Sequence, residues 1–211
     1  MAAVAQRSRA EEVGTRDRIV AAALEVFAQK GFAAASTREI ASRVGVNHGL
    51  IPYYFRTKER LWQAAVDLAF ADLAAELEAV LAVGAGEGER ARAGRLVRGY
   101  VRFVARRPAF VHLMHDEGRR RGPRLRWIVD RHVRPLFERI SELLEAVRAS
   151  GTIGVETAPV HFFYALVGAA GLIFHQAEEC RRLTGVDPFD AEVVEAHARL
   201  VEALLLGPEP G

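Results

Sequence analysis

The chain has 211 residues, of which 50% are hydrophobic and 27% charged, as in an ordinary soluble globular protein with enough residues for one large or two small domains. Its net charge of +2 is too small to indicate a partner, but residues 1–60 carry ten Lys and Arg against six Asp and Glu, a local surplus that suits phosphate binding. The single cysteine, Cys180, excludes an intramolecular disulfide and a cysteine-rich zinc site, and it fits a reducing cytoplasm.

The first thirteen residues are polar and lack the apolar core of a signal peptide, so we expect them to form a flexible arm. From Ile19 to Phe27, apolar residues recur at helical spacing and predict the first helix. Ser36 followed by Glu39 matches the capping-box pattern, which predicts a second helix that begins at Thr37.

The next residues predict a tight turn and a third helix. Gly45 stands where a helix C-terminus favours a left-handed residue, and Asn47 is a preferred N-cap for the helix that follows. Two helices joined in this way form a helix-turn-helix, and the second of them would enter the major groove of DNA. The side chains that this arrangement should bury are Ile40, Ala41, Val44, Val46, Ile51 and Tyr54.

The segment GVNHGLIPYYFRTKERL, from Gly45 to Leu61, resembles the recognition helix and following turn of the TetR family of transcriptional regulators. TRDRIVAAALEVFAQKGF, from Thr15 to Phe32, is similar to the first helix of that family. The resemblance implies an all-helical homodimer with an N-terminal DNA-binding domain and a C-terminal domain that binds an effector and dimerises. Pro52 departs from the family pattern, which usually has tyrosine there. Because proline cannot donate to the His48 carbonyl, we expect the recognition helix to bend or to be short.

Helical patterns continue through the rest of the chain, with no strand pattern and no internal repeat. Glycine and proline positions separate the later elements. They predict a fourth helix from Thr57 toward Val83, a loop at 84–89, a fifth helix at 91–105, a sixth opened by Pro108, a loop at 117–123, a seventh helix from Leu125 to Val147, a turn at 151–156, an eighth helix at 159–183, a loop at 185–190 and a ninth helix at 191–206. Pro135 lies inside the seventh helix, where we expect a kink.

The predicted fold is therefore all-α, with a three-helix DNA-binding domain, a larger helical domain and about nine helices. We expect a flexible arm at 1–13, the helix-turn-helix domain at 14–60, the effector-binding and dimerisation domain at 61–207 and a tail at 208–211. The most hydrophobic run, at 158–174, falls short of the ~20 residues that a membrane span needs. It predicts a buried helix and no membrane partner.

Side chains that point outward on the recognition helix, or that stand at the start of a neighbouring helix, are candidates for DNA contact. Asparagine and histidine reach base edges, glycine lets the backbone approach closely, and helix N-termini favour phosphate. The expected contacts are Thr37, Arg38, Asn47, His48, Gly49, Pro52, Tyr53 and Lys58.

In the larger domain, aromatic side chains lie among histidines, as in small-molecule pockets, although each taken singly is more often a core residue. The family resemblance makes them candidates for binding an apolar effector of aromatic or acyl type: Phe70, Tyr100, Phe103, Phe110, His112, Met114, His115, Trp127, His132, His161 and Tyr164. Small residues on the eighth helix permit close approach of a second copy. The expected dimer interface is Ala165, Gly168, Ala169, Leu172, Val193, Val201 and Leu204.

The function expected from these observations is that of a cytoplasmic regulator, a repressor that a small effector releases from a pseudo-palindromic DNA operator. One alternative is an architectural DNA-binding protein without an effector. Another is an enzyme that uses His112, His115, Asp116 and Glu117, but no nucleophile with an orienting partner accompanies that cluster. No histidine spacing matches a zinc motif, so neither an enzyme nor a metal or other cofactor is expected.

Overall fold

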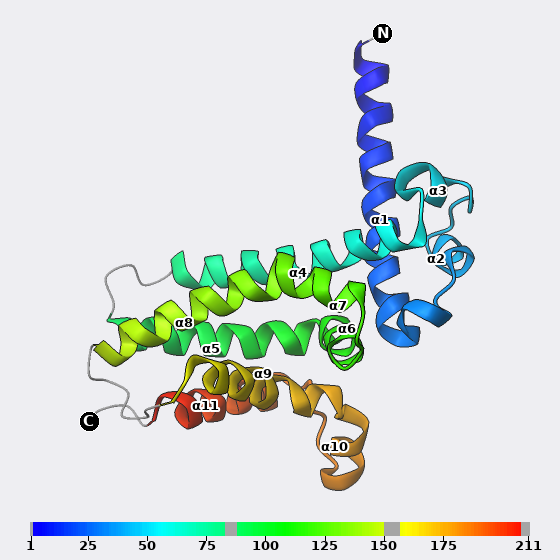
Figure 1. Ribbon diagram of the computed structural model, residues 1–211. Helices are drawn as coiled ribbons and strands as arrows, with labels where there is room; N and C mark the ends of the chain where they lie inside the picture. Colours follow the sequence, from blue (N-terminus) through cyan, green and yellow to red (C-terminus); the bar gives the residue numbers. More distant parts are fainter. Residues whose placement is uncertain (1, 83–87, 150–156, 208–211) are drawn as a thin grey trace. The chain divides into compact units, whose positions relative to one another are not determined.

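A computed structural model describes residues 2–82, 88–149 and 157–207, and within these ranges the chain is helical and forms no strand (Figure 1). The helices are α1 (Ala2–Ala34), α2 (Thr37–Arg43), α3 (Leu50–Phe55), α4 (Lys58–Ala82), α5 (Glu89–Arg106), α6 (Pro108–Gly118), α7 (Pro123–Ile128), the π-helical turn η1 (Val129–Val133), α8 (Arg134–Ala149), α9 (Pro159–His175), α10 (Ala177–Thr184) and α11 (Ala191–Leu206). The all-α prediction is confirmed. The predicted turn at 151–156, the tail at 208–211 and residues 84–87 of the predicted loop lie outside the described residues.

The chain divides into two compact units. The first comprises residues 1–71 together with 112–119, and the second comprises residues 72–111 together with 120–211. α4 and α6 therefore contribute residues to both units. The domain boundaries expected from the sequence, after residues 13, 60 and 207, remain predictions.

α1 supplies much of the core of the first unit. Ile19, Val26 and Phe27 are at most 2% exposed, in agreement with the periodic pattern that predicted this helix. Near its end, Gly31 leaves helical geometry at φ 70° and ψ 168°, a conformation that only glycine adopts readily. Regular helical geometry is therefore interrupted at the residue before Phe32.

The beginning of α1 differs from the expectation. The helix starts at Ala2, so the backbone of residues 2–13, expected to be a flexible arm, continues α1. Alanine, arginine, glutamate and glutamine are strong helix formers, and no proline interrupts the segment. The polar composition that indicated an arm is equally compatible with a helical extension.

α5 is the central helix of the second unit and packs against α8, α9 and α11 (Figure 1). Its valines Val97, Val101 and Val104 are at most 3% exposed and form part of the core. Arginine side chains join its outer surface to α11, where Arg102 donates two hydrogen bonds of 2.6 Å to Glu195. These paired contacts fix the position of α11 along α5.

Pro135 disturbs the helix at the place where a kink was expected. The disturbance is the π-helical turn η1, in which the N–H of Arg134 bonds to the carbonyl of Val129, five residues earlier. Proline has no N–H, and its ring would clash with the carbonyl four residues back, so a wider turn immediately before it relieves the conflict.

The predicted eighth helix is divided in two. α9 ends at His175, and α10 begins at Ala177 after a bend of 67°. No glycine or proline marks this bend. Phe174 is 1% exposed and packs against the rings of Phe189 and His197, at 5.6 and 5.7 Å between centroids, which requires the chain to turn back after α9.

Across the described ranges, no single helix is long and apolar enough to cross a membrane, although the bent pair α9 and α10 meets that test by length and composition when the two are combined.

Candidate functional site

α2 begins at Thr37, as predicted, but it does so without the expected capping box. The Ser36 side chain makes no capping hydrogen bond. Glu39 instead accepts a hydrogen bond from Lys30 of α1 at 2.7 Å and lies 3.4 Å from Arg43. The hydrogen bond from Lys30 and the charges of Lys30 and Arg43 lower the pKa of Glu39. α2 is therefore tied to α1 by the Lys30–Glu39 ion pair in place of a local cap.

The turn after α2 has the predicted left-handed glycine. Gly45 adopts φ 68°, and its N–H bonds to the carbonyl of Ser42 at 3.2 Å. The N–H of Val46 bonds to the carbonyl of Ala41 at 3.0 Å. These two bonds define a Schellman motif, which ends α2 and directs the chain toward the next helix.

The burial expected for this motif is partly correct. Ile40, Ala41 and Ile51 are at most 2% exposed, whereas Val44, Val46 and Tyr54 are half-buried.

Asn47 caps the turn that leads into α3. Its Oδ1 accepts the N–H of Gly49 at 2.8 Å, as an N-cap side chain does in a first helical turn. Regular α-helix begins only at Leu50, after two residues in turn conformation. A side chain at Gly49 would crowd this cap, because an added Cβ would lie 3.1 Å from the Asn47 oxygen. Glycine therefore has a local structural role at this position.

Pro52 does not cost the hydrogen bond that the sequence led us to expect. It is the third residue of α3, where backbone N–H groups have no partner within the helix. The carbonyl of His48 accepts the N–H of Ile51 at 3.1 Å, so it is satisfied without residue 52. α3 is short, with six residues, as expected, but the reason given for a bend does not apply.

Six of the eight predicted DNA-contact residues are exposed, and Thr37 is half-buried beside them in the chain. We call these seven residues of α2, α3 and the turn between them the recognition surface: Thr37, Arg38, Asn47, His48, Gly49, Pro52 and Tyr53. Thr37 Oγ1 lies 3.1 Å from His48 Nε2, which joins the start of α2 to the turn before α3. Tyr53 is 69% exposed, so its ring and hydroxyl are available to a partner.

Lys58, the eighth predicted contact, is placed differently. Its ammonium donates to the carbonyl of Ala33 at 3.2 Å and lies 4.7 Å from the centre of the Phe32 ring. The side chain is half-buried and directed toward the end of α1. Its position suits holding α4 against α1.

Two arginines that were not predicted from the sequence connect α1 with α2 and with the turn that follows it. Arg18 of α1 donates to the carbonyl of Val44, the last carbonyl before the Gly45 turn. Arg43 donates to Gln29 Oε1 at 2.8 Å. Because the partners are 26 and 14 positions apart in the chain, no local pattern could have revealed them.

The predicted effector-binding residues are divided between the two units. Phe70, His112, Met114 and His115 belong to the first unit, and the other seven belong to the second. Within the second unit, Phe103 and Phe110 are core residues whose rings pack edge to face at 5.3 Å. Burial raises the pKa of the Tyr100 hydroxyl.

Two members of that predicted set, His161 and Tyr164, do not face the interior. His161 is exposed, and Tyr164 is 68% exposed on α9. They lie on the opposite side of α9 from the buried Phe163 and Leu166. The sequence could not assign these positions because α9 is apolar around most of its circumference.

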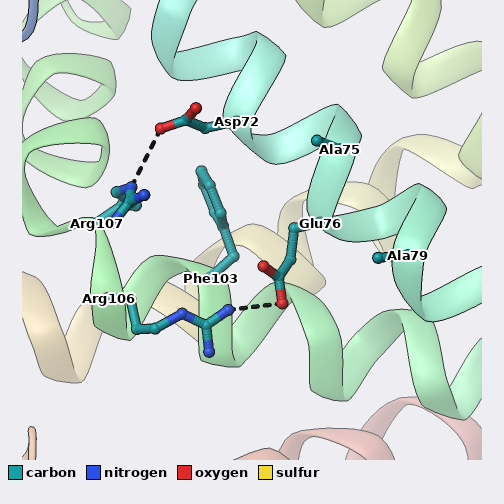
Figure 2. Close-up of a pocket in the computed structure, with 7 residues that line it drawn as sticks. All are labelled: Asp72, Ala75, Glu76, Ala79, Phe103, Arg106 and Arg107. Atoms are coloured by element: carbon teal, nitrogen blue, oxygen red, sulfur yellow. Dashed lines mark hydrogen bonds and ion pairs between the residues drawn. The ribbon is translucent and has the colours of Figure 1, made fainter.

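A hollow of about 240 Å³ lies between α4 and α5 within the second unit (Figure 2). Its lining residues are Asp72, Ala75, Glu76, Ala79, Phe103, Arg106 and Arg107, of which only Phe103 was predicted. Two ion pairs flank the Phe103 ring: Arg106 to Glu76 at 2.6 Å and Arg107 to Asp72 at 3.3 Å. An aromatic floor between charged groups suits a small molecule with an apolar body and a polar end.

α9 and α11 pack side by side and expose an apolar face, which we call the α9–α11 face. Its exposed side chains are large: Tyr164 and Leu204 are 68% and 66% exposed, and Leu200 and Leu172 are 54% and 49% exposed. Among the predicted interface residues, Ala165 and Gly168 are also exposed, while Ala169 and Val193 are half-buried.

Val201 was wrongly predicted to lie in the dimer interface. It is 0% exposed and therefore belongs to the core of its own unit, because it occupies the side of α11 that faces α5. Leu200 and Leu204, at neighbouring positions around the same helix, are 54% and 66% exposed.

Among the residues that the structure describes, no group of three His, Cys, Asp or Glu side chains is placed to hold a metal ion. Of the cluster considered for an enzyme, Glu117 is 3% exposed and Asp116 pairs with Arg119 at 3.1 Å.

The geometry of α2, the Gly45 turn and α3 defines a helix-turn-helix DNA-binding protein. Comparison with known sequences agrees. The profile of bacterial regulatory proteins of the tetR family matches residues 19–65, and that of the tetracyclin repressor-like C-terminal domain matches residues 91–204. The chain therefore belongs to the TetR family, and it is a DNA-binding transcriptional regulator.

Individual curated relatives match only part of the chain. An HTH-type transcriptional repressor of Mycobacterium tuberculosis is 49% identical over 49 residues, which are 23% of this chain and 26% of that protein. The chain is thus matched over only about a quarter of that relative.

Solved structures share the fold over almost the whole chain. The ketosteroid transcriptional regulator KstR2 of M. tuberculosis aligns with a TM-score of 0.71 at 17% identity, covering 92% of this chain and 93% of that one. The regulator FadR of Bacillus subtilis, solved in complex with stearoyl-CoA, aligns with a TM-score of 0.67 at 18% identity, covering 91% and 98%.

Proposed function

We propose that this regulator is a cytoplasmic homodimeric repressor, without enzymatic activity, that a small apolar effector releases from a pseudo-palindromic operator. The observation that carries the proposal is the recognition surface, where the Thr37–His48 contact joins the start of α2 to the turn before α3. Its exposed donors, acceptors and aromatic ring suit both phosphate and base edges in a major groove.

The DNA-binding part is tested with Arg38→Ala, measured by fluorescence anisotropy on the DNA beside the regulator's own gene at several salt concentrations. Arg38 is exposed at the start of α2. Loss of one phosphate contact in each protomer of the dimer should weaken binding and reduce the slope of log affinity against log salt by about 2.

The matched control is Arg182→Ala, which removes the same charge from an exposed position on α10. If both variants lost affinity equally, the effect would be one of net charge, and the assignment of Arg38 would be wrong.

The α9–α11 face supports dimerisation. Large apolar side chains are exposed along two adjacent helices, and a second copy would cover them by pairing the same face with itself. A dimer also places two recognition helices about 34–36 Å apart, the spacing of half-sites one DNA turn from each other.

Leu204→Glu tests this face by sedimentation equilibrium. Leu204 is 66% exposed, so a charge there should leave the fold intact, dissociate the dimer and reduce operator affinity. Leu183→Glu is the matched control, because Leu183 is 80% exposed on α10, outside the face. A Leu204→Glu protein that remained dimeric would refute the proposed interface.

The hollow beside Phe103 supports an effector site. α4 contributes residues 58–71 to the unit that contains the recognition surface and residues 72–82 to the unit that contains the hollow. A ligand that shifts α4 therefore offers a route by which the effector could change the fit to DNA. Effector and operator must then weaken each other by the same factor.

Stearoyl-CoA and a ketosteroid are the first probes to use, because FadR was solved with the former and KstR2 is a ketosteroid regulator. A true effector should lower operator affinity, and Ala75→Trp, which fills the hollow, should abolish that response while leaving DNA binding intact. Sequence-specific binding that no apolar ligand alters would favour the alternative of an effector-independent DNA-binding protein.

A further inference from the structure

A short segment of the second unit carries an unusual concentration of positive charge. Residues 120–134 contain six arginines and one aspartate, whereas the rest of the span 61–211 contains thirteen arginines against twenty acidic residues. The segment forms the end of the loop after α6, then α7, η1 and the first residue of α8. It is thus a strongly basic face on a domain that is otherwise acidic, and it will attract anions.

The basic face includes a shallow hollow of about 560 Å³. Five residues line it: Pro123, Arg126, Trp127, Asp130 and Arg131. They recur at intervals of three and four positions, so they lie along one side of α7 and η1.

An aromatic ring stands among these arginines. Trp127 is half-buried, and the guanidinium carbon of Arg131 lies 5.6 Å from its ring centre. His132 packs edge to face against the same ring at 5.4 Å. An arginine beside an indole ring suits a ligand that carries both a phosphate and an aromatic ring, because guanidinium groups bind phosphate and indole rings stack on bases.

The single carboxylate of the segment has a defined position. Asp130 pairs with Arg134 at 3.1 Å and borders the hollow. A carboxylate beside two arginines and an indole provides an acceptor for hydroxyl or amino groups. The hollow therefore combines phosphate-binding, ring-stacking and hydroxyl-accepting groups within about two helical turns.

We propose that this hollow binds a nucleoside polyphosphate, with the phosphates on Arg126 and Arg131, the base against Trp127 and a sugar hydroxyl on Asp130. The combination of a ring surface and a hollow favours a compact organic phosphate over an extended polymer. This site shares no residue with the recognition surface or with the hollow beside Phe103, and it does not depend on the proposed function.

Tryptophan fluorescence of the full-length protein provides the first test, because the chain has two tryptophans and Trp62 is only 1% exposed in the core of the first unit. ATP, inorganic tripolyphosphate and a random-sequence DNA duplex are titrated separately, and calorimetry measures each affinity without the fluorophore. ATP should change the emission saturably, bind more tightly than tripolyphosphate, and bind more weakly as salt is added.

Variants then assign the residues. Arg126→Ala and Arg131→Ala should each weaken ATP binding roughly tenfold to a hundredfold, the usual effect of losing a charged hydrogen bond. Arg131→Lys should weaken it as well, because it keeps the charge but loses the fork. Trp127→Phe should abolish the fluorescence change while leaving calorimetric affinity within a few-fold of the unmodified protein. Arg139→Ala, an exposed position on α8 outside the hollow, is the matched control and should have no effect.

Three results would overturn the proposal. The first is the absence of saturable ATP binding. The second is ATP binding that survives Arg126→Ala and Arg131→Ala but is lost in Arg38→Ala, since the anion would then occupy the recognition surface. The third is equal affinity for tripolyphosphate and ATP, which would show that the base contributes nothing to binding and that no base-stacking site exists on this face.

Discussion

Gly94 and Glu202 should be energetically coupled across the contact between α5 and α11. Gly94 is buried on α5, and a Cβ added there would lie 2.9 Å from Glu202 Cδ, with the Oε1 atom closer still. Glu202 pairs with Arg98, and their side chains are 18% and 29% exposed. Gly94→Ala must therefore displace the carboxylate and break this ion pair.

The magnitude follows from two opposing contributions. Alanine in a helix interior is more favourable than glycine by about 1 kcal/mol. Loss of a partly exposed, hydrogen-bonded ion pair costs about 1 kcal/mol. Gly94→Ala alone should therefore change the free energy of unfolding little, whereas in a Glu202→Ala background it should stabilise the protein by about 1 kcal/mol. For a chain of this size that corresponds to roughly 2–4 °C in the melting temperature.

The assay is urea unfolding of the four proteins of this double-mutant cycle, followed by circular dichroism at one protein concentration, because dimerisation makes apparent stability depend on concentration. Gly14→Ala in α1 is a control, since nothing lies within 4 Å of the Cβ it would add, and it should stabilise equally in both backgrounds. If Gly94→Ala had the same effect with and without Glu202, the reasoning would be refuted.

Three further predictions concern the turn, the core and the response to pH. Gly45→Ala should destabilise the protein by about 1–2 kcal/mol in thermal unfolding, because Gly45 holds φ 68°; an unchanged melting temperature would contradict the strain argument. Val201→Ala should cost about 2 kcal/mol because the side chain is 0% exposed, and Leu200→Ala, at 54% exposed, should affect dimerisation more than folding, as unfolding at several protein concentrations would reveal. The hydrogen bond from Arg102 lowers the pKa of Glu195 below its usual 4.5, so this contribution to stability is present above pH 4.5 and is lost as the pH falls through the folded pKa. Glu195→Gln should remove that part of the pH dependence, and a parallel loss of stability in both proteins on acidification would show that the pair does not contribute.

The recognition surface shows which structural features a local sequence pattern can predict. Gly45 and the start of α2 at Thr37 were predicted correctly, because a left-handed turn residue and a helix boundary depend on neighbours within a few positions. The capping box at Glu39 was wrong, because Lys30 and Arg43 compete for the same carboxylate. The expected cost of Pro52 was also wrong, since α3 begins later than Asn47 and places the proline in the first turn.

In the second unit the sequence predicted helices but could not assign their faces. The starts of α6 at Pro108 and of α9 at Pro159 were predicted from the geometry of proline, and so was an irregularity of the helix at Pro135. The bend after His175 has no local signal and depends on the packing of Phe174 against Phe189.

The sequence by itself determined the all-helical fold, the helix-turn-helix and the family. Apolar periodicity, caps and turn residues depend only on residues within three or four positions of one another, so they can be recognised in the sequence. Only the tertiary structure decided which apolar side chains are core and which are exposed. Val201 and Leu204 have the same chemical character, yet one is 0% and the other 66% exposed. Burial depends on which helices meet, and the contacts of α5 with α11 join residues about a hundred positions apart.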